Sequence, residues 1–250
     1  MSRCLLGIDL GTSAIKIGVF DMHGKMLGLH SVAYRVQDPK PAWAEVSPHA
    51  LWNAVLRTLK QITASVQVDS REIAGIGISS MANTPVLLDR KGKELCPAIL
   101  WIDKRSLPQC SELERIFGRP HIYGITGVEL DPSFFITKVL WIRQNKPNIL
   151  RKTWKILFPG SYMAFKLTGD TRAVVDYSLS SFGMLLDIHR LEWWQEVLPI
   201  VNLSEDQLPE LASSTEIVGE ISSSIASKTG LSKGIPVVIG GMDQSCSAFG

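Results

Sequence analysis

The sequence predicts an α/β fold in which a mixed sheet of five strands is flanked by helices. Three short extended segments joined by tight turns open the chain, and an amphipathic helix and a buried strand follow them. A further buried strand lies near the end of the 250 residues. A meander gives antiparallel pairs and a helical crossover gives parallel ones, so the sheet should contain both.

The opening meander is indicated by apolar patterning and by turn chemistry. Residues 4–9 form an apolar run of strand length, and residues 15–21 alternate between apolar and other residues. Residues 22–25, Met-His-Gly-Lys, predict a turn, after which the extended pattern resumes over residues 26–34. Three antiparallel strands are therefore expected in direct succession.

The helix after the meander is predicted by its start and by its spacing. Ser47 suits the N-cap and Pro48 the first helical position. Leu51, Val55 and Leu59 then recur at helical intervals, which places an apolar stripe against the sheet.

The later elements are predicted from the same signals. Residues 73–79 and 235–239 are apolar runs typical of buried strands. Residues 240–243 are expected to break the last strand, and a helix should begin at Gln244. The remaining expectations are helices over residues 104–117, 133–145, 162–167 and 192–197, a strand over residues 86–89, and short elements without a motif over residues 202–234.

Composition excludes several classes of protein. The 26 Lys and Arg against 24 Asp and Glu leave a net charge of +2, which gives no footprint for nucleic acid or an anionic membrane. No apolar run approaches the roughly 18 to 20 residues that span a bilayer, and the N-terminus has no signal-peptide pattern. The four scattered cysteines fit reduced thiols, so a cytoplasmic protein is expected.

Residues 7–13, Gly-Ile-Asp-Leu-Gly-Thr-Ser, form the strongest chemical signal. A carboxylate at the end of a buried strand is costly unless it meets a cation or donors, and Asp9 is followed by a glycine and two hydroxyls whose backbone can line an anion site. Lys16 lies just beyond. The set suits a magnesium–phosphate site. The alternative is a hairpin in which Gly11 takes a positive φ and Asp9 caps the turn.

Residues 240–244, Gly-Gly-Met-Asp-Gln, form a second signal at a strand-to-helix junction. Glycines let a ligand approach the backbone, and a helix N-terminus should keep Asp243 ionised and ready to accept a proton. An ordinary aspartate N-cap explains the same residues.

Two weaker signals follow other predicted elements. Trp101 could form the wall of a site for a small polar ligand, with Asp103 beside it, or Trp101 could belong to the core while Asp103 caps the next helix. The polar and small residues 79–83 directly follow a buried strand, where open sheets place ligand contacts. A plain loop explains that segment equally well.

Six motifs occur in a fixed order along the chain. They are residues 7–13, Trp101-x-Asp103-x-Arg105, Lys138-Val-Leu-Trp141-Ile, Leu167-Thr168-Gly169, Asp176-Tyr177-Ser178 and Gly240-Gly241-Met242-Asp243-Gln244. In this order the chain resembles the N-terminal domain of the FGGY family of carbohydrate kinases from Leu6 to Gly250. The resemblance implies an actin/hexokinase-like (ribonuclease H-like) domain over residues 1–250, with residues 240–250 beginning the connection to a second, nucleotide-binding domain.

The resemblance also implies a reaction and its residues. ATP would phosphorylate a hydroxyl of a small sugar, sugar acid or polyol, with Asp243 as general base and Asp9 on the magnesium side, reaching the ion through a water. Asp9 and Asp243 should converge across one crevice. The phosphate contacts implied are Gly11, Thr12, Ser13 and Lys16. The substrate contacts implied are Met81, Ala82, Asn83, Trp101, Asp103 and Gln244.

Departures from the family pattern bear on the substrate. Glycerol kinases carry Arg-Glu where this chain has Ala82-Asn83, and a tyrosine where it has Ser133, which argues against glycerol. Xylulokinases carry Met-His at the positions of Ala82-Asn83. Separately, Met242 stands where a glycine is common in the family, and its side chain should narrow the mouth of the pocket. A xylulose-type pentulose is the leading expectation for the substrate. Dimers occur in the family, so the resemblance also allows a homodimer.

Two other functions stay open on the sequence alone. An actin- or chaperone-like ATPase shares the fold and the Asp-x-Gly-Thr turn, but it needs no base facing a small hydroxylated ligand. A regulator derived from a kinase would fit the replaced Arg-Glu pair. The 250 residues alone are expected to bind ATP poorly and to turn over negligibly, because the family's second domain carries most adenosine contacts.

Overall fold

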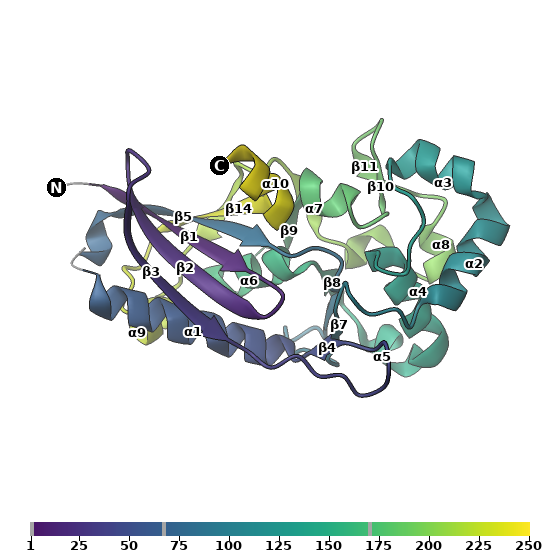
Figure 1. Ribbon diagram of the computed structural model, residues 1–250, viewed down its shortest axis with the longest axis horizontal. Helices are drawn as coiled ribbons and strands as arrows, with labels where there is room; N and C mark the ends of the chain where they lie inside the picture. The colour runs from purple at the N-terminus through teal and green to yellow at the C-terminus, as the bar shows by residue number, and fades with distance from the viewer. Residues whose placement is uncertain (1–2, 67–68, 170–171) are drawn as a thin grey trace.

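The computed structural model describes residues 3–66, 69–169 and 172–250, which form a sheet part and a helical part side by side (Figure 1). The sheet part contains a six-stranded mixed sheet in the order β13-β14-β5-β1-β2-β3. Its strands are β1 (Cys4–Leu10), β2 (Ala14–Asp21), β3 (Met26–Ala33), β5 (Ile73–Ser80), β13 (Ile217–Glu220) and β14 (Pro236–Met242).

The pairing confirms the mixed sheet. β1, β2 and β3 form the predicted antiparallel meander, whereas β5 runs parallel to both β1 and β14. The expected number of five strands is wrong, because β13 adds an antiparallel edge beside β14. Its four residues bury only Val218, and so short an edge strand leaves almost no apolar period in the sequence.

Helix α1 (Pro48–Ser65) confirms the predicted caps and stripe. The Ser47 hydroxyl accepts from the backbone N–H of Ala50 at 3.3 Å, and Pro48 begins the helix. Its apolar side packs under β2 and β3, while α9 (Ser223–Thr229) lies beside it on the same face (Figure 1). Helix α6 (Pro159–Thr168), which ends at Gly169 as predicted, packs on β14 and β5.

The helical part has a core of its own, which includes stacked Phe135 and Phe158 rings with centroids 4.2 Å apart. Its helices are α2 (Leu107–Phe117), α3 (Arg119–Thr126), α4 (Phe135–Asn145), α5 (Pro147–Lys152), α7 (Tyr177–Ser181) and α8 (Leu198–Val201). The short strand pairs are β4 (Glu45–Val46) with β7 (Ala98–Ile99), β6 (Val86–Leu88) with β8 (Lys155–Leu157), β9 (Val174–Asp176) with β12 (Glu210–Ala212), and β10 (Leu186–Asp187) with β11 (Glu192–Trp193). Within the described ranges, no helix is both long and apolar enough to cross a membrane.

The helix expected over residues 192–197 is wrong. Trp193 instead pairs with Leu186 in β11, and the backbone N–H of Trp194 donates to the Leu185 carbonyl at 2.6 Å. Both indoles are buried, as the sequence suggested for a core edge. A local apolar run could not show that its backbone partner lies on a segment several residues upstream.

The break expected at residues 240–243 is also wrong, because β14 continues to Met242. The strand absorbs its two glycines as an irregularity in its pairing with β5 between Val238 and Gly241. Gly240 has a φ of +67°, and a Cβ built there would stand 1.8 Å from the carbonyl oxygen of Ile78. The glycine therefore lets two parallel strands approach each other beside the site described below.

Gly240→Ala is expected to lower the free energy of unfolding by at least about 3 kcal/mol, since backbone strain adds to a contact with a strand that cannot yield. Gly24→Ala is the matched control. Gly24 has a φ of +82°, but nothing lies within 4 Å of its added Cβ, so only the strain of about 1 kcal/mol remains. Urea unfolding of both variants measures the difference, and equal losses would contradict the contact at Ile78.

Candidate active site

The site lies where the carboxyl ends of the parallel strands meet the helical part. Thr12 follows β1, Met81 follows β5 and Asp243 follows β14. Open α/β sheets present ligand contacts at this edge, because loops leave the sheet here and backbone groups are free. The main-chain N–H of Met81 donates to the Leu10 carbonyl at 2.9 Å and fixes two of these loops to each other.

A cavity of about 240 Å³, called the central cavity below, opens between the two parts. It gathers predicted residues from four segments that are distant in sequence, and it adds four that sequence reasoning did not assign to the site. The predicted residues are Thr12, Met81, Ala82, Asn83, Trp101, Asp243 and Gln244. The added ones are Asp131, Ser133, Phe134 and Phe182, and Met242 lines the cavity as its position suggested.

A second concavity of about 440 Å³, the Asp9 hollow, lies on the face of the sheet and is lined mainly by residues of β1, β2 and β5. In the sheet register Asp9 lies between Lys16 and Ser79. The Lys16 ammonium stands 3.7 Å from Asp9 Oδ2, and the Ser79 hydroxyl donates to Asp9 Oδ1 at 3.1 Å. Cys246 of α10 (Asp243–Phe249) closes one side. The hollow therefore offers an ammonium group, from Lys16, that can pair with a phosphate and a carboxylate, from Asp9, that can face the metal ion of that phosphate.

Asp9 and Asp243 line neighbouring hollows instead of one common crevice. The two carboxylates still interact. Burial raises the pKa of Asp243 most, and the negative charge of Asp9 raises it further. The hydrogen bond that the Asp243 carboxylate accepts from the backbone N–H of Gln244, at 2.8 Å, acts in the opposite direction. The direction is opposite to the one expected from the helix N-terminus, because partial burial and the Asp9 charge outweigh the backbone N–H groups of Gln244 and Asp243, which lower the pKa. A raised pKa makes Asp243 a stronger proton acceptor once ionised.

The turn of residues 11–13, between β1 and β2, is held by Tyr34, which follows β3. The Tyr34 hydroxyl donates to the Gly11 carbonyl, and the Tyr34 N–H donates to the Ser13 carbonyl at 3.1 Å. Gly11 does not take a positive φ, so the hairpin alternative is wrong in that respect. Ser13 is exposed and lines neither hollow, which leaves Thr12 as the hydroxyl of this turn inside the central cavity.

Trp101 bridges the two parts of the molecule. Its indole Nε1–H donates to Thr12 Oγ1 at 2.9 Å, and its side chain is 41% exposed, so it does not belong to the core. Because the hydroxyl of Thr12 accepts this bond, its own proton is free to donate to a ligand.

Asp103 does not reach the central cavity, and its expected substrate role does not fit the structure. The side chain is fully buried, and it accepts from the Arg105 guanidinium at 2.7 Å and from the Ala44 N–H at 2.5 Å. Arg105 also bonds Glu45 at 2.6 Å and lies 3.6 Å from the centre of the Trp43 ring. The proximity of Asp103 to Trp101 in sequence suggested a shared site, but the chain turns Asp103 inward. Asp103 does not cap α2 either, since Ser106 holds the N-cap position.

Asn83 lines the central cavity and links it to the start of α4. Its Oδ1 accepts from the Phe135 N–H at 3.0 Å, and its backbone takes a φ of +56°. The carboxamide therefore caps α4 from the loop after β5. The amide NH₂ is the group of Asn83 left for a ligand.

Asp176 and Ser178 hold the strand end that carries Asp243. The Met242 N–H donates to Ser178 Oγ at 2.8 Å, and that hydroxyl donates to Asp176 Oδ2 at 2.5 Å. Asp176 is fully buried and also accepts from the Ser214 hydroxyl at 3.0 Å. The motif of residues 176–178 thus fixes the residue before Asp243 through a charge-assisted bond.

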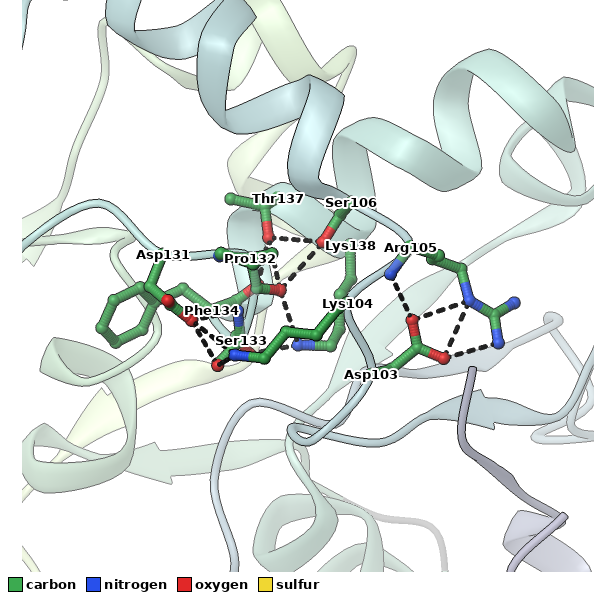
Figure 2. Close-up of polar contacts among 10 residues, drawn as sticks. All are labelled: Asp103, Lys104, Arg105, Ser106, Asp131, Pro132, Ser133, Phe134, Thr137 and Lys138. Atoms are coloured by element: carbon green, nitrogen blue, oxygen red, sulfur yellow. Dashed lines mark hydrogen bonds and ion pairs between the residues drawn. The ribbon is translucent and has the colours of Figure 1, made fainter. Parts of the chain in front are cut away.

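The unpredicted wall of the cavity is the loop over residues 131–134 (Figure 2). Asp131 accepts from the Ser133 N–H at 2.8 Å and from the Lys104 ammonium at 3.2 Å. The Phe134 ring packs edge-on to Phe182, with centroids 5.4 Å apart. The signal available for Asp131 was its position just before a predicted helix, and the signal for Ser133 was the tyrosine that glycerol kinases carry there. The sequence around Phe182 offered none.

The carboxylate at the Asp9 hollow, that of Asp9, fits a magnesium ion that is held mainly by the phosphates of its nucleotide. Among the residues that the structure describes, no three His, Cys, Asp or Glu side chains gather into a metal cage. Magnesium typically takes one or two carboxylates and completes its shell with phosphates and water. Asp9, whose side chain is 35% exposed, can supply one such carboxylate.

This architecture and the site at the strand ends define an actin/hexokinase-like fold. Residues 4–250 match the model of the FGGY family of carbohydrate kinases, N-terminal domain. The chain belongs to this family.

Similar proteins agree with this assignment. Xylulose kinase of Bacillus subtilis is 33% identical over 99% of this chain and 49% of its own length, and glycerol kinase of Thermococcus gammatolerans is 34% identical over 100% and 50%. The crystal structure of Plasmodium falciparum glycerol kinase with ADP matches with a TM-score of 0.90 at 25% identity, over 99% of this chain and 50% of that one. The chain thus spans about half the length of the curated relatives it matches.

Proposed function

We propose that this chain is the N-terminal part of an ATP-dependent kinase that phosphorylates a hydroxyl of a small sugar or polyol. The observation that carries the proposal is the position of Asp243, whose carboxylate lines a cavity sized for a small ligand and lies beside the Asp9 hollow. Family membership and the relatives named as xylulose and glycerol kinases support the same reaction class.

In this proposal Asp243 accepts the proton of the substrate hydroxyl as its oxygen attacks the terminal phosphate of ATP. Phosphoryl transfer needs little covalent help from the protein, so positioning and charge neutralisation dominate. Lys16 lines the Asp9 hollow on the phosphate side, and the free proton of Thr12 points to the same phosphate from the central cavity in this proposal. Gly11 and Ser13 line neither hollow, so their implied phosphate contacts would form only when the nucleotide is bound. A magnesium ion beside Asp9 would supply the neutralising charge.

We assign the remaining contacts to the nucleotide to a second domain outside residues 1–250. Residues 240–250 would begin the connection to it. Closure of two domains around the ligands would exclude water from the reactive phosphate. Residues 1–250 alone are therefore proposed to bind ATP poorly and to show negligible sugar-dependent release of ADP.

The lining of the central cavity favours a neutral sugar. Asp131 and Asp243 are its charged residues, and no lysine or arginine is among the described residues that line it. A sugar acid would bring its carboxylate toward two others, and the Lys104 ammonium beside the wall is already paired with Asp131. Trp101 offers an apolar ring face to C–H groups, so a xylulose-type pentulose fits better than an aldonate.

A phosphorylation screen of the protein made from its complete coding sequence tests the substrate class. Pentuloses, hexuloses, polyols and aldonates would each be offered with MgATP, and ADP release would be measured. We expect a neutral pentulose to give the largest kcat/KM. Preference for an aldonate would contradict the charge argument, and ATP hydrolysis that no sugar stimulates would favour an actin-like ATPase or a regulator.

The cellular setting is proposed on the same basis. All four cysteines are free thiols, and a small-molecule sugar with ATP is available in the cytoplasm. Assembly as a homodimer stays a prediction, which light scattering of the purified protein measures directly.

A further inference from the structure

Lys138 is a fully buried lysine with no part in the reaction described above. It lies in the first turn of α4, where the positive end of the helix dipole disfavours a cation. An ammonium taken out of water is costly unless it finds strong hydrogen-bond partners. Lys138 therefore needs a compensating set of acceptors.

The acceptors of Lys138 are backbone carbonyls of the cavity wall. Its Nζ donates to the Pro132 carbonyl at 3.2 Å and to the Ser133 carbonyl (Figure 2). Asp131 and Ser133, on either side of that proline, line the central cavity, and so does Phe134. The buried ammonium thus holds the wall from the side opposite the ligand space.

Uncharged or exposed donors meet the same loop. The hydroxyls of Ser106 and Thr137 donate to the Pro132 carbonyl at 2.8 and 3.1 Å, and the Lys104 ammonium contacts the side chains of Asp131 and Ser133. Lys104 is half exposed and screened by water, whereas Lys138 acts on the main chain inside the protein. Lys138 is thus the cation that fixes the backbone of the wall.

Charged and titratable groups face Lys138 from each neighbouring element. The loop before α2 contributes Asp103 and Lys104, the wall contributes Asp131, and α2 contributes Cys110. Asp103 is already engaged by Arg105. Burial outweighs the two carboxylates and lowers the pKa of Lys138 to about 7. The ammonium is therefore charged below neutral pH and loses its proton above it.

We propose that Lys138 is a positioning residue for the substrate, which holds the wall of residues 131–134 against the central cavity and so sets the affinity for the sugar. The inference rests on the proposed function of that cavity. The charged amine donates stronger hydrogen bonds than the neutral one, so the KM for the sugar should rise as the pH increases through 7.

Lys138→Met, made in the complete protein, tests the proposal. We expect the KM for the sugar to rise about tenfold at pH 6.5, with kcat changed much less, since a bond from a charged group to the wall is lost. The dependence of KM on pH between 6 and 8.5 should disappear. A merely structural role would lower the amount of folded enzyme without altering KM or its pH dependence.

Lys155→Met is the matched control. Lys155 also donates to two main-chain carbonyls, those of Asp206 at 2.6 Å and Leu208 at 3.0 Å, but it lies outside the central cavity. Its loss should leave the sugar KM and the pH dependence unchanged. Lys138→Arg, which keeps a charge at every pH, should give a KM that does not vary with pH.

The outcomes separate this proposal from the proposed function. An unchanged sugar KM in Lys138→Met, or a flat KM between pH 6 and 8.5 in the wild-type enzyme, overturns the role of Lys138 alone. The wild-type profile decides the question even where neither variant folds. Absence of sugar phosphorylation in the wild-type enzyme overturns the proposed function and this inference together.

Discussion

Asp243→Asn is expected to reduce kcat for sugar phosphorylation by about 10²- to 10⁴-fold in the complete enzyme, the range for loss of a general base. Asparagine fills the same space but cannot accept the proton of the substrate hydroxyl. The KM for the sugar should change by only a few fold, because the remaining cavity residues are untouched. Steady-state rates of ADP release measure both constants.

The pH dependence gives the same residue a second test. The pKa of Asp243 is raised by burial and by Asp9, so the base becomes protonated, and kcat falls, at a higher pH than for an ordinary aspartate. Asp89→Asn is the control, since Asp89 lies in an exposed turn and accepts from the Lys91 N–H at 2.8 Å. Full activity of Asp243→Asn would show that another group takes the proton.

Arg105→Met is expected to lower the free energy of unfolding by about 3–5 kcal/mol, the cost of breaking a buried ion pair from one side. The Arg105 side chain is fully buried, and so is its partner Asp103. Methionine replaces the apolar stem of the arginine but leaves the Asp103 carboxylate without its cation. Its second partner, Glu45, loses the same bond. Urea unfolding measures the loss.

A double-mutant cycle identifies the cause of that loss. Asp103→Asn combined with Arg105→Met removes both charges, so the double variant should be destabilised by clearly less than the sum of the two single variants. The exposed pair of Arg71 and Asp69 is the control, because Arg71→Met removes a cation that water already screens. Additive losses at Asp103 and Arg105 would rule out coupling between them.

Much of the fold could be predicted where the signal is local. The meander, α1 with its N-cap at Ser47 and its first helical residue Pro48, and strand β5 confirm expectations that need only neighbouring residues. The predicted helix boundaries differ from the observed ones where side chains form tertiary contacts. The helix expected from residue 104 begins at Leu107, because Asp103 and Arg105 form a buried ion pair before it.

The sequence motifs predicted which segments form the site, but they did not predict every residue that lines the cavity. The strand-end segments around Thr12, Met81 and Asp243 do meet at one cavity, because carboxyl ends of parallel strands share an edge of the sheet. Asp103 was misplaced, and Phe182 was missed. Each depends on which way a loop of the helical part turns, and hydrophobic periodicity carries no information about that.

Taken alone, the sequence determined the mixed α/β sheet, since backbone preference and apolar period are properties of short stretches of chain. Its motifs, in their order, carried the resemblance to the family and marked the segments that bear the chemistry. Only the tertiary structure decided that Asp103 is buried, that residues 131–134 form a cavity wall on Lys138, and that the pKa of Asp243 is raised. Burial and charge at a point are set by atoms that arrive from many parts of the chain, and these come together only when the protein folds.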